Sequence, residues 1–420
     1  MPIYNVIMDW SDPLLTDLKL LNREFWRGHR SLVLGFFAVA LVYLFIAWGL
    51  GLDIFAHSDY DAYTLQAQTW LKGRIALDQD YSWLEIARYD GQYFVSFPPF
   101  PAVVMVPFVL AFNEATPSVL VVFLYFMASY VVGYALARRF GYGDVLAACL
   151  GAFLVLGCNM LEVAHYGGVW NMAQALAFLL TLLSFYLMTS RRRKAWHASL
   201  ICIALAVGCR PFQAFYVPVL VYMLAKKLPK AEGQSWPSVK ALLPYLLAPA
   251  AIAAAYCVYN FVRFGDILEF GHNYLPEFVE APHGQFSLNY VGTNLMNILR
   301  LPYLENGRLA FPIFSGFAFF IANPIYLIWG RTCAWAAVKR RIKVQEALLI
   351  AAFLAHFFVM LMHKSFGGWQ FGTRYLCDLI PAMYFFILSG RGKTGAVTAA
   401  VMIFAVAFNI YGAVVFHVLS

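Results

Sequence analysis

Long apolar runs recur along almost the whole chain and limit it to one class of fold. We expect helices at residues 31–50, 117–137, 144–158, 169–188, 196–209, 212–225, 241–262, 311–330, 345–362, 375–390 and 395–417. Hydrophobic residues make up 62% of the 420 residues and charged residues only 12%, against about 25% charged in a soluble domain. Since roughly 20 apolar residues cross a bilayer, the sequence predicts an all-α polytopic membrane protein with about eleven transmembrane helices.

Basic residues are concentrated in alternate loops, and this bias predicts how the chain is oriented. If the N-terminus is cytoplasmic, the clusters Arg138-Arg139, Arg191–Lys194 and Lys339–Lys343 all lie on the cytoplasmic side. That arrangement satisfies the positive-inside rule. The net charge of +8 does not indicate a nucleic-acid-binding protein, because these clusters are short and form no continuous patch.

The apolar segment Pro98–Phe112 decides the topology of everything after it. If it crossed the membrane, all later basic clusters would move to the outer side. Its four prolines favour an irregular start over a regular crossing, so we expect a juxtamembrane or re-entrant helix on the outer face. The predicted organisation is a cytoplasmic segment 1–30 and one membrane domain 31–420, with large extracytoplasmic loops at 51–116 and 263–310.

The first outer loop contains a polar stretch, Phe55–Pro101, that is acidic and aromatic in a chain with few acids. Asp59 and Asp61 lie near its start, and a carboxylate held near the bilayer surface among cations can act as a general base. A solvated loop acid or a helix cap is the plainer interpretation of the same pair. We expect Asp59 to cap an interfacial helix that carries Tyr63 on its apolar stripe and ends at Gly73.

Several cations lie on the outer side, against the general charge bias. Recognition of a phosphate needs such groups, and arginine binds phosphate in a bidentate way; snorkelling toward the interface is the alternative for each. Asp378 is the acid inside a predicted span, and we expect it to pair with the cation four residues before it. The candidate phosphate-binding residues are Arg374, Arg88, Arg210 and Lys364.

Polar and aromatic residues at two other outer positions are candidates to line a substrate cavity. The stretch Lys364–Tyr375 combines paired glycines with aromatic rings that can stack on a sugar or an isoprenoid. An interfacial aromatic belt with a glycine turn is the alternative, and a lone interfacial histidine is usually only hydrogen-bonded. The histidines have no zinc-site spacing, and the chain has no phosphate-binding P-loop. The candidate cavity residues are Tyr63, Glu162, His165, Tyr166, Trp369 and Gln370.

Several short motifs occur together in one order along the chain. They are Asp59-Tyr60-Asp61, QTWLKGRIAL (68–77), YDGQYFVSFPPFPAVVMVPF (89–108), Ala137–Arg139, Arg210-Pro211 and GGWQFGTRYL (367–376). In this order they resemble the GT-C glycosyltransferases, which are polytopic enzymes that take sugars from polyprenyl-phosphate carriers. That group includes protein O-mannosyltransferases and the aminoarabinose transferase of lipid A. The resemblance implies a GT-C-like fold with juxtamembrane helices in the first extracytoplasmic loop.

The resemblance also implies a reaction. Asp59, or alternatively Asp61, would act as base on an acceptor hydroxyl, while the four outer cations, Arg374 and Arg88 first, hold the donor phosphate. A sugar would pass by inverting displacement from polyprenyl phosphate to a lipid, glycan or protein acceptor on the extracytoplasmic face. The two aspartates could also ligate a divalent metal ion through oxygen, the one cofactor that the residues suggest.

Two other functions remain open at this point. A transporter or lipid flippase would explain the spans, but transporters concentrate polar residues at mid-membrane rather than in a long outer loop. A non-catalytic scaffold protein would tolerate Asp59→Asn. The outer segments contain no Asn-x-Ser/Thr site, which fits the plasma (inner) membrane of a bacterium.

Overall fold

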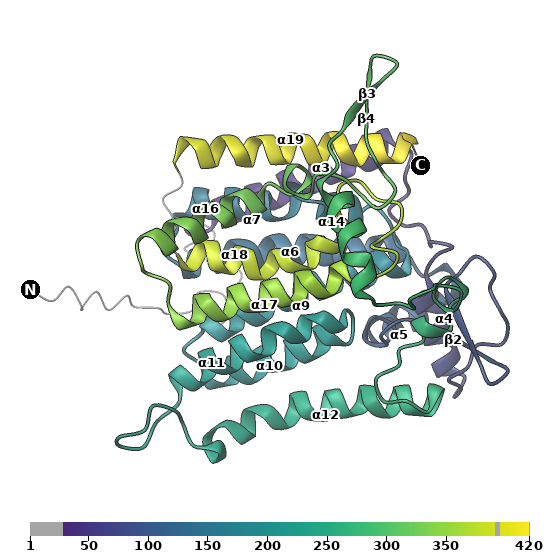
Figure 1. Cartoon of the computed structure of the whole chain (residues 1–420), viewed down its shortest axis with the longest axis horizontal. Coiled ribbons are helices and arrows are strands. Elements are labelled where there is room, and N and C mark those ends of the chain that lie inside the picture. Colours follow the sequence, from purple (N-terminus) through teal and green to yellow (C-terminus); the bar gives the residue numbers. More distant parts are fainter. Residues whose placement is uncertain (1–27, 391–394, 420) are drawn as a thin grey trace, which may run out of the picture.

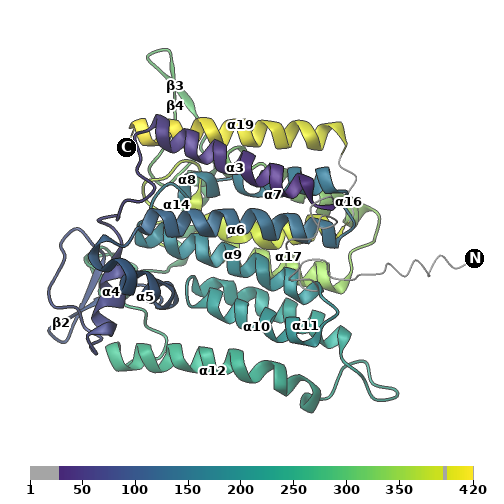
Figure 2. The same cartoon turned by 180° about the vertical axis from the view of Figure 1, so that it is seen from behind.

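A computed structural model describes residues 28–390 and 395–419 and has the predicted fold class, a bundle of helices with little sheet. The helices run side by side, as Figure 1 shows from one side and Figure 2 from behind. Six described helices are long and apolar enough to cross a membrane: α3 (Arg30–Gly49), α6 (Ser118–Arg139), α9 (Val169–Thr189), α12 (Val239–Phe264), α17 (Val344–Leu361) and α19 (Ala396–Leu419). The chain is therefore a multi-pass membrane protein. Eleven crossings stay a prediction, and most of the predicted segment 1–30 lies outside the described residues.

The remaining helices of the bundle are shorter than these six. They are α7 (Asp144–Leu156), α8 (Met160–Val163), α10 (Arg193–Val207), α11 (Val217–Lys227), α15 (Phe319–Ala322), α16 (Ile325–Val338) and α18 (Ile380–Ser389). The 3₁₀ turns η2 (Pro211–Tyr216) and η5 (Arg374–Leu379) precede α11 and α18. A proline lies at or beside the first helical position of α11, α16 and α18, where its missing N–H breaks no helical hydrogen bond.

The predicted span 311–330 is wrong as a single helix. Residues 311–318 are irregular, and the helical part is divided into α15 and α16 and ends only at Val338. Pro324 separates the two helices, since it cannot donate to the turn before it. Gly316 adopts φ +83°, a left-handed conformation that a continuous right-handed helix excludes.

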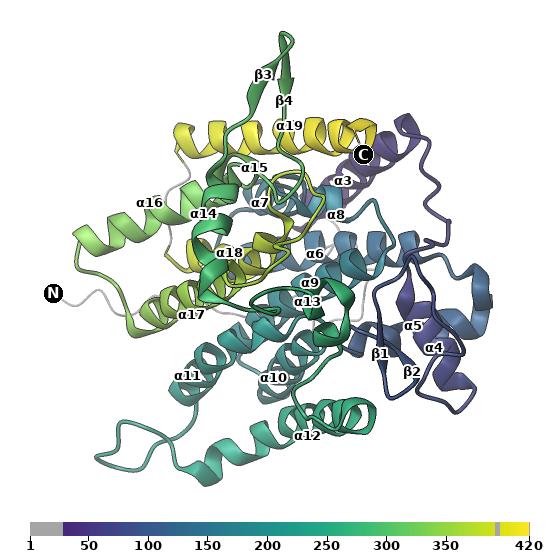
Figure 3. The ribbon, with the colours of Figure 1, turned by 45° about the vertical axis from the view of Figure 1, so that its right-hand side comes forward.

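The two ends of the bundle differ in character (Figures 1 and 3). One end, called the loop end below, carries the first outer loop and the segment between α12 and α15. The other, called the basic end below, carries the start of α3 and the C-terminal ends of α6 and α11. Arg138 and Arg139 occupy the last turn of α6, and Lys226 and Lys227 that of α11, where cations also stabilise the helix dipole.

The first outer loop folds into two short helices and a hairpin: α4 (Ala62–Leu71), β1 (Ile86–Tyr89), β2 (Gln92–Val95), α5 (Phe100–Phe112) and the turn η1 (Asn113–Ala115). Both helices lie at the loop end and pack on each other, as juxtamembrane helices do (Figure 1). The cap of α4 is Asp61 and not the predicted Asp59. The hairpin, which the all-helical prediction lacked, turns at Asp90-Gly91, where both residues have positive φ, as a tight hairpin turn requires.

The second outer loop contains only short elements: η3 (His272–Tyr274), α13 (Pro276–Val279), η4 (Leu288–Tyr290), α14 (Val291–Leu299), β3 (Tyr303–Glu305) and β4 (Arg308–Ala310). Gly265 ends α12 in the left-handed conformation, the usual cap before such a change of direction. The β3–β4 hairpin projects away from the bundle beside α19 (Figures 1 and 3). The elements before it cover the loop end, where the candidate site lies.

Helix α9 lies near the centre of the bundle and packs on α6, α10 and α18. Small residues allow the neighbouring helices to approach closely: a Cβ on Gly151 of α7 would lie 3.1 Å from the carbonyl oxygen of Tyr130 in α6. In lipid such close packing, rather than the hydrophobic effect, holds helices together. Helix α12 lies at the edge of the bundle and is mostly unburied (Figure 1).

Candidate active site

A cavity of about 340 Å³ opens at the loop end, between the bundle and the outer loops. Its volume is in the range of small-molecule sites, and its walls are mostly apolar and aromatic with a few polar groups, as in most such sites. The polar or aromatic residues that matter below come from α9, the turn before η2, the second outer loop, the end of α17 and η5: Trp170, Arg210, His272, His363 and Tyr375.

A buried ion pair lies at the inner wall of this cavity. Arg210 donates through Nε to Oδ2 of Asp378 at 2.8 Å. The amide of Gln174 donates to Oδ1 of Asp378 at 2.9 Å, so both oxygens of the buried carboxylate have partners, as burial demands. The predicted pairing of Asp378 with Arg374 is wrong, because both residues lie in the 3₁₀ turn η5 and its geometry directs the carboxylate to Arg210.

Tyr375 joins this ion pair to a second cation. The centroid of its ring lies 4.8 Å from the guanidinium carbon of Arg210 and 5.2 Å from that of Arg374. Arg374 is buried and donates through Nη2 to the carbonyl of Gly367 at 3.1 Å, while its Nη1 has no hydrogen-bond partner among the described residues. A buried guanidinium with an unused donor beside an apolar cavity is suited to bind an anion.

Amide side chains hold the loop that carries Arg374. Oε1 of Gln370 accepts a hydrogen bond from the backbone N–H of Arg374 at 2.7 Å. Nδ2 of Asn323 donates to Oδ1 of Asn159 at 2.6 Å, and Nδ2 of Asn159 donates to the carbonyl of Phe371 at 2.6 Å. Gln370, a predicted cavity residue, is therefore buried beneath the loop and positions Arg374 instead of lining the cavity.

Two carboxyl groups with shifted pKa values flank Arg374. Desolvation raises the pKa of half-buried Glu85 to about 7, and the indole N–H of Trp170 donates a hydrogen bond to it. Desolvation also raises the pKa of buried Glu162 to about 7, and its Oε2 has no hydrogen-bond partner among the described residues. The charge of Arg374 acts on both groups and opposes these shifts. A carboxyl group that titrates near pH 7 is suited to general acid–base chemistry.

Asp61 lies inside the protein, whereas Asp59 is exposed. Oδ1 of Asp61 accepts from the backbone N–H groups of Tyr63 and Thr64 at 3.0 and 3.1 Å, and Oδ2 accepts from the hydroxyl of Thr64 at 2.6 Å. Desolvation raises the pKa of Asp61 despite these bonds. The hydroxyl of Tyr63 is buried without a hydrogen-bond partner among the described residues, within reach of the charges of Asp61 and Arg210.

Two histidines line the cavity as neutral rings. Desolvation lowers the pKa of His272 to about 4 and that of His363 to about 3. The ring of His272 packs edge-on to Phe97 at a centroid distance of 4.9 Å, and Nε2 of His363 lies 3.2 Å from the amide nitrogen of Gln285. At neutral pH both rings supply hydrogen-bonding groups and aromatic surface, but no charge.

Three of the four predicted phosphate-binding cations, Arg374, Arg88 and Lys364, are not among the residues that line this cavity. Arg88 is exposed and donates to Asp80 at 2.8 Å. Lys364 is half-buried and donates to the backbone carbonyl of Glu277. Of the four predicted cations, Arg210 lines the cavity, Arg374 contacts the same Tyr375 ring without lining the cavity, and the other two lie elsewhere.

None of the six predicted cavity residues is among those that line this cavity. Tyr63, Glu162 and Gln370 are buried inside the protein, and the other three have separate surroundings. His165 is hydrogen-bonded to its own helical turn and stacks on Tyr43 at a centroid distance of 4.2 Å. Tyr166 packs against Phe416 of α19. Trp369 is 62% exposed on the outer surface. His165 and Trp369 thus have the structural roles that were their alternative interpretations in the sequence.

The aspartate pair does not fit the predicted divalent ion. The described ranges 28–390 and 395–419 contain no group of three or more His, Cys, Asp and Glu side chains that could hold a metal. Both oxygens of Asp61 already accept hydrogen bonds, and Asp59 is exposed, so the two do not form a set of oxygen ligands. No step proposed below uses a metal ion.

Sequence reasoning missed the residues that connect the outer loops to the cavity. Glu85 is one of several acids in the first loop, and its shifted pKa depends on packing against Trp170 of a distant helix, so nothing local marks it. His272 likewise lies in a long loop without a motif. Tyr375 could have been found, because it follows Arg374 within the motif GGWQFGTRYL and aromatic rings often stack on guanidinium groups.

Comparison with solved structures identifies the fold. The chain is similar to ArnT from Cupriavidus metallidurans in the apo state, with 18% sequence identity and a TM-score of 0.51 over 88% of this chain and 61% of that chain. It is also similar to the same protein bound to undecaprenyl phosphate, with 14% identity and a TM-score of 0.54 over 90% of this chain and 63% of that chain. The chain thus spans about three fifths of the length of the solved structures it matches. No protein-family model and no curated protein matches the sequence.

ArnT is a GT-C enzyme, and the match extends over most of the described chain. The predicted GT-C-like architecture is therefore confirmed as the fold of this protein. At this level of sequence identity the likeness concerns the fold alone, and the chemistry has to be argued from the site.

Proposed function

We propose that this chain, which has the GT-C fold, is a membrane glycosyltransferase that transfers a sugar from a polyprenyl-phosphate donor to an acceptor hydroxyl at the loop end. The observation that carries the proposal is the unpaired Nη1 of buried Arg374, which does not itself line the mostly apolar cavity but contacts its wall residue Tyr375. A phosphate attached to a long apolar chain needs this combination of a cation and apolar walls. The bound undecaprenyl phosphate in the ArnT structure supports this class of donor.

In this proposal, arginines hold the donor phosphate and stabilise it as it leaves. Arg374 offers Nη1, and Arg210 lines the cavity while its Nε is bonded to Asp378. Preorganised donors at a developing negative charge are often the largest contribution to catalysis. Tyr375, which contacts both guanidinium groups, fixes their relative position.

Glu85 is the general base in this proposal. Its pKa of about 7 and its hydrogen bond with the cavity residue Trp170 suit the removal of a proton from an acceptor hydroxyl. The acceptor oxygen attacks the anomeric carbon as the bond to the phosphate oxygen breaks, and the polyprenyl phosphate leaves with the electron pair. A single displacement inverts the anomeric configuration. Asp61 positions the start of α4, and Asp59 and Asp61 stay the alternative bases that the resemblance implies.

The same proposal assigns a membrane side and a class of acceptor. With the basic end in the cytoplasm, the cavity opens on the extracytoplasmic face of a bacterial plasma membrane. The acceptor is a hydroxyl on a lipid, a glycan or a protein that reaches this face. In this proposal the chain has a cytoplasmic segment, 1–30, and one membrane domain, 31–420.

The test is sugar transfer by the purified protein from a panel of radiolabelled polyprenyl-phosphate sugars, with donor binding measured in parallel. We expect Glu85→Gln to bind donor and to lower kcat by about a hundredfold or more, the usual contribution of a general base. Arg374→Gln should instead weaken donor binding, since it removes a charge-assisted contact. Glu114→Gln, the same change at an exposed acid of the first loop, is the matched control and should behave as wild type.

Other outcomes would change the proposal in defined ways. If Asp59→Asn or Asp61→Asn abolishes turnover while Glu85→Gln does not, the base is the aspartate that the resemblance favours. If the wild-type protein binds the donor lipid but transfers no sugar to any acceptor, the protein is better explained as a transporter or lipid flippase than as an enzyme. If it binds no polyprenyl phosphate, the proposed function is wrong.

A further inference from the structure

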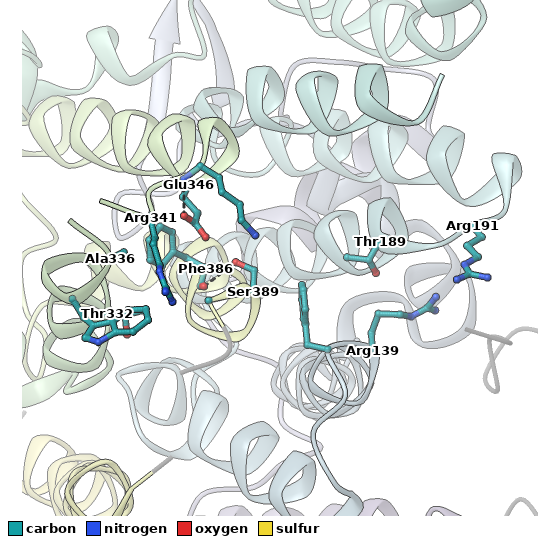
Figure 4. A pocket seen from close by; sticks show the side chains of 13 residues that line it. Arg139, Thr189, Arg191, Thr332, Ala336, Arg341, Glu346, Phe386 and Ser389 are labelled. Carbon is teal, nitrogen blue, oxygen red and sulfur yellow. Dashed lines mark hydrogen bonds between the residues drawn. The ribbon is translucent and has the colours of Figure 1, made fainter. Parts of the chain in front are cut away.

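A second and larger cavity, of about 660 Å³, lies at the basic end of the bundle. It is formed by the C-terminal ends of α6, α9, α16 and α18 and by the start of α17. Figure 4 shows Arg341 and Glu346 on one side and Arg139 and Arg191 on the other, with Phe386 and Ser389 between them. The candidate active site is at the opposite end of these helices, so this cavity has no part in the proposed transfer.

Basic residues outnumber acidic residues among those that line this cavity. Four are basic, Arg139, Arg191, Arg341 and Lys343, and one is acidic, Glu346. Oε2 of Glu346 accepts a hydrogen bond from the backbone N–H of Lys343 at 2.9 Å, so part of its charge serves the start of α17. Arg341 and Lys343 lie on the same wall, and two neighbouring cations attract an anion more strongly than one does.

The shape and position of the cavity favour a phosphate carried by a lipid. Phe140, Trp335 and Phe386 give it apolar walls beside the cations, and Trp335 is 51% exposed, as residues at a membrane interface often are. The volume far exceeds that of a phosphate ion. Basic pockets between transmembrane helices on the cytoplasmic side are typical sites for anionic lipid head groups.

The threonine hydroxyl groups in the cavity wall already donate hydrogen bonds within the protein, so the basic side chains have to supply the donors for a phosphate. Thr189 donates to the carbonyl of Tyr186 at 2.6 Å, and Thr332 donates to that of Ile328 at 2.7 Å. Their protons are therefore directed back into their own helices. Arginine and lysine supply the donors that a phosphate needs, and arginine can bind two phosphate oxygens at once.

We propose that this cavity is a binding site for a phosphate group, presented by an anionic phospholipid of the membrane leaflet at the basic end. Arg341 and Lys343 contact the phosphate, and the aromatic wall contacts the glycerol and the first part of the acyl chains. The inference does not depend on the proposed glycosyltransferase activity.

The experiment measures thermal unfolding of the purified full chain in detergent, titrated with short-chain phosphatidylglycerol, phosphatidylcholine of the same acyl chains, or inorganic phosphate. We expect phosphatidylglycerol to raise the Tm and phosphatidylcholine to leave it unchanged. Arg341→Gln/Lys343→Gln should bind phosphatidylglycerol about thirtyfold more weakly, since each basic residue near an anionic lipid contributes about a fivefold gain. Lys194→Gln/Lys240→Gln removes two exposed charges that do not line the cavity and should bind as wild type.

Each remaining outcome decides between stated alternatives. Equal stabilisation by the two lipids, or equal weakening in both double variants, overturns the proposal, because the effect is then diffuse surface charge. If inorganic phosphate matches phosphatidylglycerol and its effect is lost in the cavity variant, the phosphate site stands and a free phosphate is its ligand. Should the double variant fail to fold, Arg341→Gln alone serves instead, with about fivefold weaker binding expected.

Discussion

At the scale of single residues, Glu162 is a buried acid whose Oε2 has no hydrogen-bond partner among the described residues. Its pKa of about 7, against an ordinary 4.5, arises from desolvation. The folded protein therefore holds this proton more tightly than the unfolded chain does. Relative to its value below pH 4.5, the free energy of unfolding therefore falls as the pH rises from 4.5 to 7. Above pH 7 this loss of stability no longer grows.

We predict that Glu162→Gln stabilises the protein at pH 8, because the amide avoids burying an unpaired carboxylate. The gain should be at most about 3 kcal/mol at pH 8 and should largely vanish at pH 5. Thermal unfolding in detergent at the two pH values measures it, with exposed Glu114→Gln as control. A gain of the same size at both pH values would show that ionisation is not its cause.

Which residues carry the site could be predicted only in part. Arg374 and Arg210 were found because cations on the outer side break the charge bias. The partner of Asp378 was not, since a spacing of four residues predicts a contact only in an α-helix and η5 is a 3₁₀ turn. Its true partner, Arg210, lies in a distant segment, and no local pattern indicates such a contact.

At the scale of elements, two helices that begin with a 3₁₀ turn meet through one ion pair. Arg210 precedes the turn η2 before α11, and Asp378 lies in the turn η5 before α18. The first turn of a helix has backbone N–H groups without helical partners. Inside a membrane such groups are tolerated only where protein surrounds them. Gln213 of η2 helps here, because its amide donates to the backbone carbonyl of Asp378 at 3.1 Å.

We predict strong coupling between Arg210 and Asp378. Arg210→Gln or Asp378→Asn alone should each destabilise the protein by about 3–5 kcal/mol, because each leaves a buried charge without its partner. The double variant should cost clearly less than the sum of the two. Unfolding titrations measure this cycle, and the exposed pair Arg88 and Asp80, expected to give less than about 1 kcal/mol, is its control. Additive effects at Arg210 and Asp378 would refute the coupling.

Elements with a strong local signal were predictable and those without one were not. The helices α4 and α5 followed from their apolar pattern and their terminal glycine and prolines. The hairpins turn at Asp90-Gly91 and Asn306-Gly307, which are recognised hairpin dipeptides, so both could have been predicted. The interruption between α15 and α16 was hidden within a long apolar run, in which only Pro324 marks it.

At the scale of the whole molecule, the prediction that matters most is its orientation. Trp83 at the loop end and Trp236 at the basic end are both well exposed. In a background without the native cysteines, Trp83→Cys should react with a membrane-impermeant maleimide on intact cells, and Trp236→Cys only after lysis. Labelling of both cysteines on intact cells would mean that the two ends do not face opposite sides of the membrane.

The overall architecture was the most predictable level, because bilayer thickness and charge bias act on the whole chain at once. The multi-pass fold and its GT-C likeness are confirmed, although the chain is much shorter than ArnT. The exact number of crossings is harder to predict, since α10, α11 and α18 are shorter than a regular span.

Helix α9 extends from one cavity to the other, so its length gives their separation. Trp170, in the first turn of α9, lines the cavity at the loop end, and Thr189, its last residue, lines the cavity at the basic end. A helix of 21 residues is about 30 Å long, which is also the thickness of the hydrocarbon core of a bilayer. In the proposed orientation, each cavity is thus level with the head groups of a different leaflet. A single lipid cannot span both, so the two proposed lipid sites would be filled from different leaflets. A change in the lipid composition of one leaflet would then alter the occupancy of one site only.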